Sequence, residues 1–416
     1  MPPQPRRSPV DGFADLRLAV VSPFVDRSHG TERALAELLD RLARRYHCEI
    51  HLYSQRVGDI EVQTPGAVLG DETGSIFWHR VPSIAGPQLI RFIWWLVANG
   101  LIRRFDALVG RTDVDLVLSP GINCLNADVV IVHALFHRLY QLSRATNSEG
   151  MHRAGFLRAL HRRAYYLLLT LLEHHVYGRR SVSLAAVSQR TASLLAQYFG
   201  RDAVLIPNGV DTLQFSVAAR LSRRTEARRL RDFRDTDFVL LLIGNDWRIK
   251  GVPAVLAAMA AAPVLPLRLL AVGSEAVGPF QEMASRLGVA ERCIWTPPQR
   301  DVIELYAAAD VYVSPTREDS FGLPVAEAMA CGLPVITSAM AGVSAEIRHK
   351  TDGFVLADPS DVRSLIDLLE WLCADEALRN RIGEAASRAA HDWNWDRGAE
   401  ALWDLLNSTV QVKLRR

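Results

Sequence analysis

The sequence predicts an α/β fold of two doubly wound domains, each with a parallel sheet between layers of helices. The chain has 416 residues, which is too long for one compact core and favours two domains. Short apolar runs alternate with longer amphipathic stretches, and this alternation stops at a linker and restarts near residue 237. Such texture is typical of strands buried between helices.

The first half opens with a βαβ unit. An apolar run over 16–22 predicts a strand, His29-Gly30-Thr31 lies in the following loop, and 32–45 predicts an amphipathic helix. Further strands are predicted over 49–54, 116–119, 129–133, 182–188 and 204–207. Helices are predicted over 153–177 and 189–199. These elements define a first domain over 13–211.

The second half follows a linker that runs through 208–211 into an arginine-rich stretch over 220–234. Strands are predicted over 238–243, 267–272, 293–295, 311–314 and 335–337. They define a second domain over 237–392, and the chain closes with a helix after Trp395 within 393–412. Ligands of doubly wound sheets bind at the carboxyl ends of the strands, so this edge is where a site is expected.

Composition limits the function classes. A net charge of +2 is too balanced to predict nucleic-acid binding. Five cysteines without CxxC spacing predict neither a zinc site nor a disulfide framework, and they favour a reducing cytoplasm. No apolar run approaches the ~18–20 residues of a membrane span, and no signal peptide is visible. We therefore expect a cytoplasmic protein, with the inner face of the cell membrane as the alternative location.

The densest chemical signal is the segment 315–338. A strand predicted to end near residue 314 leads into a loop that carries Glu318, Asp319 and Phe321. A glycine, Gly322, precedes a helix in whose first turn Pro324 fits well. A strand, a glycine-containing loop and a helix N-terminus together form a geometry suited to phosphate.

Three residues of this segment have expected contacts. The backbone N–H groups of Gly322 and Leu323 are placed to meet a diphosphate at the positive end of the helix dipole. Glu327 lies one turn into the helix, where it is placed to reach a ribose. The alternative is that Glu327 only complements the helix dipole, which is worth ~0.3–1 kcal/mol.

The segment resembles the signature of family 4 glycosyltransferases, which have the GT-B fold of two Rossmann-like domains. That signature is an acidic residue, seven others and then a glutamate, with Phe-Gly-Leu-Pro between them. The glutamate matches Glu327, whereas the first acidic position falls on Asp319, where the family usually has a glutamate. Glu318 lies one position before Asp319. Either the sugar lies closer to the shorter side chain of Asp319, or Glu318 shares the role of this acidic position.

The resemblance extends from about residue 16 to residue 406. Similar pieces occur in order at 30–33, 206–211, 308–311 and 394–396. It implies domains that face a central cleft and a C-terminal helix that returns to the N-terminal domain. It further implies a nucleotide-diphosphate sugar as donor, a hydroxyl acceptor on a glycan, lipid-linked glycan or small molecule, and retention of the anomeric configuration. Cell-envelope or polysaccharide biosynthesis is the expected setting, with no metal and no cofactor.

The resemblance also implies the phosphate-binding cations. The family places a lysine just before the second glycine of the loop after the first strand of this domain, and Lys250 matches it. The usual arginine after the first glycine, Gly244, is replaced by Asn245, and Arg248 is our substitute. Such cations stabilise the charge of a departing diphosphate, a contribution of ~3–4 kcal/mol per well-placed donor. A solvated basic loop is the alternative for Arg248.

In the first domain the resemblance selects Gly30, in the glycine loop before the first long helix, and His133, at the end of a strand. His133 would serve catalysis, with a purely structural histidine as the alternative. The preceding strand ends in Ser119-Pro120-Gly121, where the family often has another histidine. With Asp319 and Lys250, His133 completes the predicted catalytic set.

For the weaker signals we favour structural interpretations over functional ones. The triplets Asp113-Val114-Asp115 and Asp235-Thr236-Asp237 match a metal-binding pattern but are common in acidic turns. Aromatic and arginine residues over 88–104 suggest membrane contact or a lipid groove. The alternative that we favour is core packing of a helix. A basic stretch over 151–180 suggests binding to anionic lipid headgroups. The alternative that we favour is a solvated helix face.

The alternatives to a transferase are a catalytically idle nucleotide-sugar-binding subunit and another GT-B activity, such as a phosphorylase or an epimerase. Slow donor hydrolysis without acceptor would distinguish the enzyme from the idle subunit. A phosphorylase would instead need inorganic phosphate and would produce a free sugar phosphate.

Overall fold

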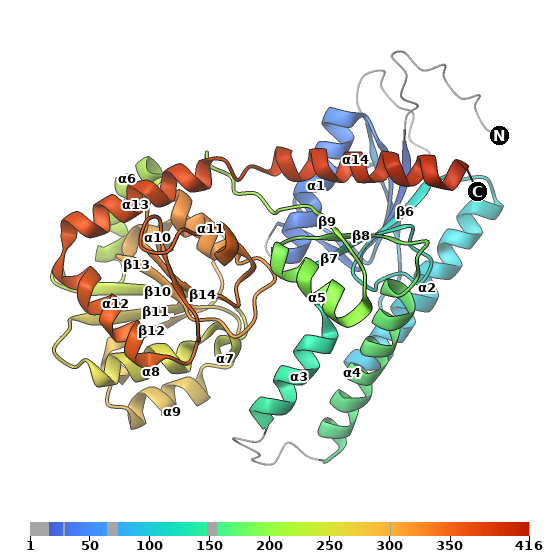
Figure 1. The fold of residues 1–416 in the computed structure, drawn as a ribbon. Helices are drawn as coiled ribbons and strands as arrows, with labels where there is room; N and C mark the ends of the chain where they lie inside the picture. Colours follow the sequence, from blue (N-terminus) through green and yellow to red (C-terminus); the bar gives the residue numbers. More distant parts are fainter. Residues whose placement is uncertain (1–15, 28–29, 65–73, 148–155, 300, 416) are drawn as a thin grey trace. The chain divides into compact units, whose positions relative to one another are not determined.

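The computed structural model describes residues 16–27, 30–64, 74–147, 156–299 and 301–415. The chain forms two compact units, an N-terminal unit of Met1–Pro207 with Asp396–Arg416 and a C-terminal unit of Asn208–Trp395 (Figure 1). The expected loop residue His29, the domain start at 13–15 and the basic residues at 151–155 lie outside the described residues.

The N-terminal unit contains a parallel sheet in the order β5-β3-β1-β6-β7-β8-β9. Its strands are β1 (Arg17–Val21), β3 (Glu49–Ser54), β5 (Ile76–Arg80), β6 (Leu116–Pro120), β7 (Val129–Val132), β8 (Ser183–Ala186) and β9 (Val204–Leu205). A separate small pair joins β2 (Phe24–Val25) to β4 (Arg56–Val57). The helices are α1 (Gly30–Tyr46), α2 (Gln88–Leu108), α3 (Phe136–Asn147), α4 (Phe156–Tyr177) and α5 (Gln189–Phe199).

The C-terminal unit contains a second parallel sheet, in the order β12-β11-β10-β13-β14-β15. Its strands are β10 (Phe238–Ile243), β11 (Leu267–Val272), β12 (Cys293–Thr296), β13 (Val311–Ser314), β14 (Val335–Ser338) and β15 (Phe354–Leu356). The helices are α6 (Val217–Arg229), α7 (Trp247–Lys250), α8 (Val252–Ala261), α9 (Gly278–Arg286), α10 (Ile303–Ala308), α11 (Leu323–Ala330), α12 (Val362–Ala374) and α13 (Glu376–His391).

Both sheets are covered on both faces. The first five residues of β10 and all four residues of β7 and β13 are buried, without alternation between exposed and buried positions. A strand buried at successive residues must have a helical layer on each side, because successive side chains point to opposite faces. The predicted doubly wound architecture is therefore present in each unit.

The last helix, α14 (Trp395–Leu414), packs on the N-terminal unit. Near its start, the guanidinium of Arg41 on α1 donates to Asp396 at 2.7 Å. Near its end, the Thr409 hydroxyl donates to the Ser183 hydroxyl of β8 at 2.9 Å. Between them Trp403 stacks on Tyr46, with ring centroids 4.9 Å apart. The chain thus returns to its first unit after completing the second.

The arginine-rich stretch that the sequence assigned to a linker is largely a helix, α6, capped by the Ser216 side chain. Arg224 donates to the carbonyl of Ala309 at 2.8 Å and forms an ion pair with Asp310. Arg228, one turn further on, is 6% exposed and bonds to the carbonyl of Ala308 and to Asp310. Cations at a helix C-terminus compensate its unpaired carbonyls, so these arginines fix α10 to α6 and are structural.

Candidate functional site

The predicted donor residues of the C-terminal unit gather at the carboxyl ends of β10 and β13. From β10 the chain moves outward on one side through β11 and β12, then crosses to β13 on the other side. The strands β10 and β13 are direct neighbours, so the strand order reverses between them. Open parallel sheets bind ligands at such a switch point.

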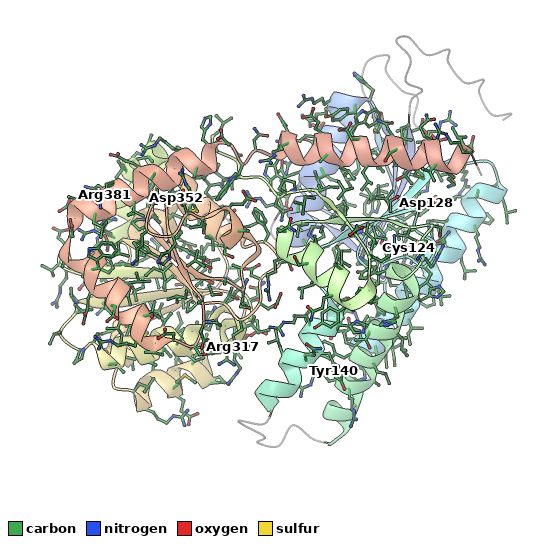
Figure 2. All side chains as sticks on the ribbon, viewed as in Figure 1. Cys124, Asp128, Tyr140, Arg317, Asp352 and Arg381 are labelled. Carbon is green, nitrogen blue, oxygen red and sulfur yellow. The ribbon has the colours of Figure 1, made fainter. Side chains whose placement is uncertain are left out.

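A close approach of backbones joins the two loops at this point. Gly251, after α7, has φ of 93°, and a Cβ there would lie 2.3 Å from the carbonyl oxygen of Pro315, after β13. Only glycine fits at this junction. The N–H of Arg317, labelled in Figure 2, donates to the carbonyl of Ile249 at 2.8 Å. The loop that carries Lys250 is therefore anchored to the loop that carries Asp319.

Lys250 and Asp319 form an ion pair in which the ammonium donates to Oδ2 of the carboxylate. Their side chains are 19% and 16% exposed, so the pair is largely but not fully removed from solvent. The aliphatic stem of Lys250 crosses Gly244, where a Cβ would lie 2.8 Å from Cγ of the lysine. Gly244 thus leaves room for the side chain that the site uses.

The loop around Asp319 is held from its other side by the segment after β14. The N–H of Asp319 donates to the carbonyl of Met340 at 3.1 Å, and the N–H of Gly342 donates back to the Asp319 carbonyl at 2.9 Å. The adjacent Glu318 is half-buried, and its N–H lies 3.3 Å from the Thr316 hydroxyl oxygen. The backbone of Asp319 is therefore fixed on both sides.

Helix α11 begins immediately beyond this loop. Gly322 is its N-cap with φ of 99°, a left-handed conformation that favours glycine. Phe321 and Leu323 on either side are 6% and 8% exposed and hold the turn in the core. Within the described part of the chain, the N–H groups of Gly322 and Leu323 have no acceptor. These orphan donors and the helix dipole give the site a positive end suited to an anion.

Glu327 lies in the interior of the unit, with 5% of its surface exposed. The hydroxyl of Tyr306, on α10, donates to Oε2 of Glu327 at 2.6 Å. Burial and the neighbouring carboxylate charge raise the pKa of Tyr306 well above its usual value, so the phenol stays protonated. The sequence analysis did not include Tyr306, since no local spacing connects it to Glu327.

Arg248 is not part of the Lys250–Asp319 group. It is exposed on the single turn of α7, two residues before Lys250, so the two side chains leave the helix in roughly opposite directions. No ion pair of Arg248 occurs among the described residues. At the position where the family has arginine, the side-chain oxygen Oδ1 of Asn245 accepts the N–H of Ser274 at 3.2 Å and joins the β10 loop to the β11 loop.

The two predicted residues of the N-terminal unit lie at the carboxyl edge of its own sheet. Gly30 is the exposed first residue of α1, and His133 directly follows β7. His133 is 7% exposed, and its Nε2 is buried with no hydrogen-bond partner in the described residues. Burial lowers the pKa of His133 to about 4, so the imidazole is neutral near pH 7.

We expect acid to destabilise the N-terminal unit through His133. Its folded pKa of about 4 lies below the unfolded value near 6.5, so the stability that it contributes is present above the unfolded pKa and falls as the pH drops towards 4. Between pH 7 and pH 5, protonation of His133 should lower the free energy of unfolding by about 2 kcal/mol. Amide exchange of β6, β7 and β8 at the two pH values measures it. The loss should shrink by that amount in His133→Gln, and an equal loss in both proteins would contradict the assignment.

The acidic triplets have structural partners. Asp115 accepts the N–H of Arg17 at 2.9 Å, and Asp113 forms an ion pair with the same arginine at 3.5 Å. The Asp237 carboxylate accepts the N–H of Arg234 at 2.8 Å. Among the described residues no three His, Cys, Asp or Glu side chains are grouped as a metal site. No described helix is long and apolar enough to cross a membrane.

Comparison with known families gives two matches. The model of glycosyl transferases group 1 matches residues 223–389, and the model of Glycosyltransferase Family 4 matches residues 28–214. A D-inositol 3-phosphate glycosyltransferase of Xylanimonas cellulosilytica is 31% identical over 237 residues, which are 54% of this chain and 56% of that protein. One of Pseudarthrobacter chlorophenolicus is 33% identical over 251 residues, 57% of this chain and 58% of that protein. The chain thus spans about half the length of the curated relatives it matches.

Solved structures show the same fold. WaaG, a glycosyltransferase involved in lipopolysaccharide biosynthesis, has a TM-score of 0.73 at 20% identity, covering 93% of this chain and 99% of WaaG. HepE of Anabaena, solved in complex with UDP-glucose, has a TM-score of 0.67 at 16% identity, covering 94% of this chain and all of HepE. At these identities the similarity supports the two-domain architecture.

Proposed function

The chain belongs to the glycosyltransferases described by the group 1 and family 4 models, and from this premise we propose that it transfers a hexose from a nucleotide-diphosphate sugar to a hydroxyl group. The bond between the anomeric carbon and the diphosphate oxygen breaks, and a bond from that carbon to the acceptor oxygen forms. The acceptor proton leaves with the departing diphosphate. The expected stereochemical course is retention.

The Lys250–Asp319 pair beside the N-terminus of α11 is the observation that carries this proposal. The departing diphosphate gains negative charge, and a fixed ammonium with two orphan N–H donors stabilises that charge without further reorganisation once the donor is bound. In the proposed complex Lys250 exchanges its carboxylate partner for a phosphate oxygen. Asp319 then becomes available to accept hydrogen bonds from the sugar hydroxyls, and Glu318 lies next to it.

The other predicted residues have assigned roles in the same proposal. Glu327 accepts from a ribose hydroxyl, as acidic residues of doubly wound sheets do. His133 is neutral and suited to hydrogen-bond a hydroxyl during transfer, and Gly30 assists donor binding. No resident metal is required, because Lys250 and the helix N-terminus supply the positive charge.

Similar proteins support parts of this assignment. HepE was solved with UDP-glucose, which favours a nucleotide-sugar donor. The curated relatives are named for transfer to inositol 3-phosphate, which is one candidate acceptor. A glycan or lipid-linked glycan of cell-envelope or polysaccharide biosynthesis is the other.

The test is release of nucleoside diphosphate from a panel of UDP-, GDP- and ADP-hexoses, with and without inositol phosphate or glycan acceptors. We expect turnover in one nucleotide series, enhanced by one acceptor and unaffected by a chelator. NMR of the product would show the donor's anomeric configuration. Donor binding without release under any condition would favour the idle subunit. Activity lost with the chelator and restored by Mn²⁺ or Mg²⁺ would contradict the metal-free assignment.

A further inference from the structure

One face of α2 exposes large apolar side chains along most of its length. Apart from one adjacent pair, successive members lie three or four residues apart, so they share one side of the helix. They are Ile90, Ile93, Trp94, Val97, Leu101, Phe105 and Leu108, which we call the α2 face. Leu101 is 61% exposed and Leu108 is 86% exposed. The core packing favoured from the sequence is therefore wrong for this side of the helix.

The opposite side of α2 accounts for the helix's structural role. Trp95 and Ala98 are buried in the core of the N-terminal unit, and the Trp95 indole donates to the carbonyl of Asn123 at 3.1 Å. Apart from Trp94, whose indole donates to the carbonyl of Pro82 at 2.8 Å, the α2 face has no part in these core contacts. Contiguous exposed apolar surface of this kind marks an interaction site.

Helix α4 lies beside α2 and extends this surface (Figure 1). The rings of Phe92 and Tyr165 meet edge to face at 6.1 Å, and the Gln88 amide donates to the Tyr165 hydroxyl at 3.2 Å. On its own solvent side α4 exposes Leu167 and Leu171, at 55% and 60%.

The exposed charges of these two helices are positive. On α2, Arg91 and Arg104 are exposed, whereas the one acidic residue, Asp106, is 3% exposed and accepts from the His79 ring at 2.8 Å. The described part of α4 exposes Arg162 and Arg163. Its one acidic residue there, Glu173, has no exposed surface and accepts the N–H of Phe136 at 2.6 Å. Both carboxylates are thus withdrawn into the unit.

We propose that the α2 face and the adjoining side of α4 dock on a membrane surface that carries anionic lipids. An apolar helix face with neighbouring arginines suits the boundary between acyl chains and anionic headgroups. A helix at this boundary lies parallel to the membrane surface. A second copy of the chain fits this face less well, because a symmetric contact places like patches together and brings their arginines face to face. The inference goes beyond the proposed transfer reaction and does not depend on it.

Co-sedimentation of the full chain with vesicles tests this inference. Binding is expected with phosphatidylcholine vesicles that contain phosphatidylglycerol, and it should weaken without phosphatidylglycerol or at high salt. The double variant Ile93→Gln and Leu101→Gln should weaken binding on the order of tenfold or more. The double variant Arg91→Gln and Arg104→Gln should weaken it by roughly fivefold per arginine.

The matched control removes two apolar side chains of the C-terminal unit that are even more exposed than Ile93 and Leu101. Leu213 and Val264 are 93% and 88% exposed, so Leu213→Gln with Val264→Gln should leave vesicle binding unchanged. All substituted positions are exposed, and unchanged thermal unfolding would verify the fold. The proposal would be overturned if the chain did not bind anionic vesicles, or if the α2-face variants and the control variant lost vesicle binding equally. If the chain is a dimer that Ile93→Gln with Leu101→Gln converts to a monomer, the α2 face is instead the contact with a second copy.

Discussion

Lys250→Ala is expected to lower kcat by about 10²–10³-fold, because one preorganised donor to developing charge contributes that much. Lys250 is the ammonium held against Asp319 at the switch point of the C-terminal sheet. Its stem lies over Gly244, so the charge is already in place before the donor arrives. Steady-state kinetics with the donor found in the nucleotide-sugar panel would measure the effect.

Arg248→Ala is the matched control for this prediction. It removes the same charge two residues away, from an exposed side chain that the structure does not bring to the pair. An exposed charge of this kind is worth ~0–1 kcal/mol, so kcat should change by no more than a few-fold. An Arg248 variant more damaging than the Lys250 variant would show that the donor contacts the other side of α7.

Glu327→Ala should raise the donor dissociation constant at least tenfold, since a hydrogen bond to a charged group is worth ~1.5–3 kcal/mol. It should also destabilise the C-terminal unit by ~1–3 kcal/mol, because the buried Tyr306 hydroxyl loses its acceptor. Calorimetry gives the affinity, and denaturant unfolding gives the stability.

Two further variants separate the two effects. Glu327→Gln keeps an oxygen that can accept from Tyr306 but removes the charge, so stability should recover while donor affinity stays low. Tyr306→Phe removes the hydroxyl and leaves the carboxylate, so it should affect stability more than affinity. Unchanged affinity in folded Glu327→Ala would remove Glu327 from the donor site and leave it a structural partner of Tyr306.

The strands of the C-terminal unit could be predicted closely from the sequence. The predicted runs 238–243, 267–272 and 311–314 coincide with β10, β11 and β13. Central strands of a parallel sheet are buried on both faces, so they are read as continuous apolar runs. Strand β5, Ile76–Arg80, was missed because it lies at the sheet edge and ends in a histidine and an arginine.

The arrangement of the site was less predictable. The motif around 319–327 identified an anion-binding helix N-terminus, because Gly322 and Pro324 specify that turn locally. The contacts of Lys250 with Asp319, and of Tyr306 with Glu327, join residues 69 and 21 positions apart. The reversal of strand order brings the first pair together, and the reach of the Tyr306 hydroxyl from α10 to α11 forms the second. No local periodicity encodes such pairs.

Hydrogen exchange with UDP, GDP and ADP in turn tests most directly whether a nucleoside diphosphate binds at the switch point of the C-terminal sheet. The Gly322 and Leu323 N–H groups have no acceptor within the described chain, so they should exchange quickly in the free protein and slow on binding. We predict that one of the three ligands protects 244–251 and 319–327 and leaves 376–391 unchanged. Binding that leaves 319–327 unprotected, or protection confined to another part of the chain, would contradict the account.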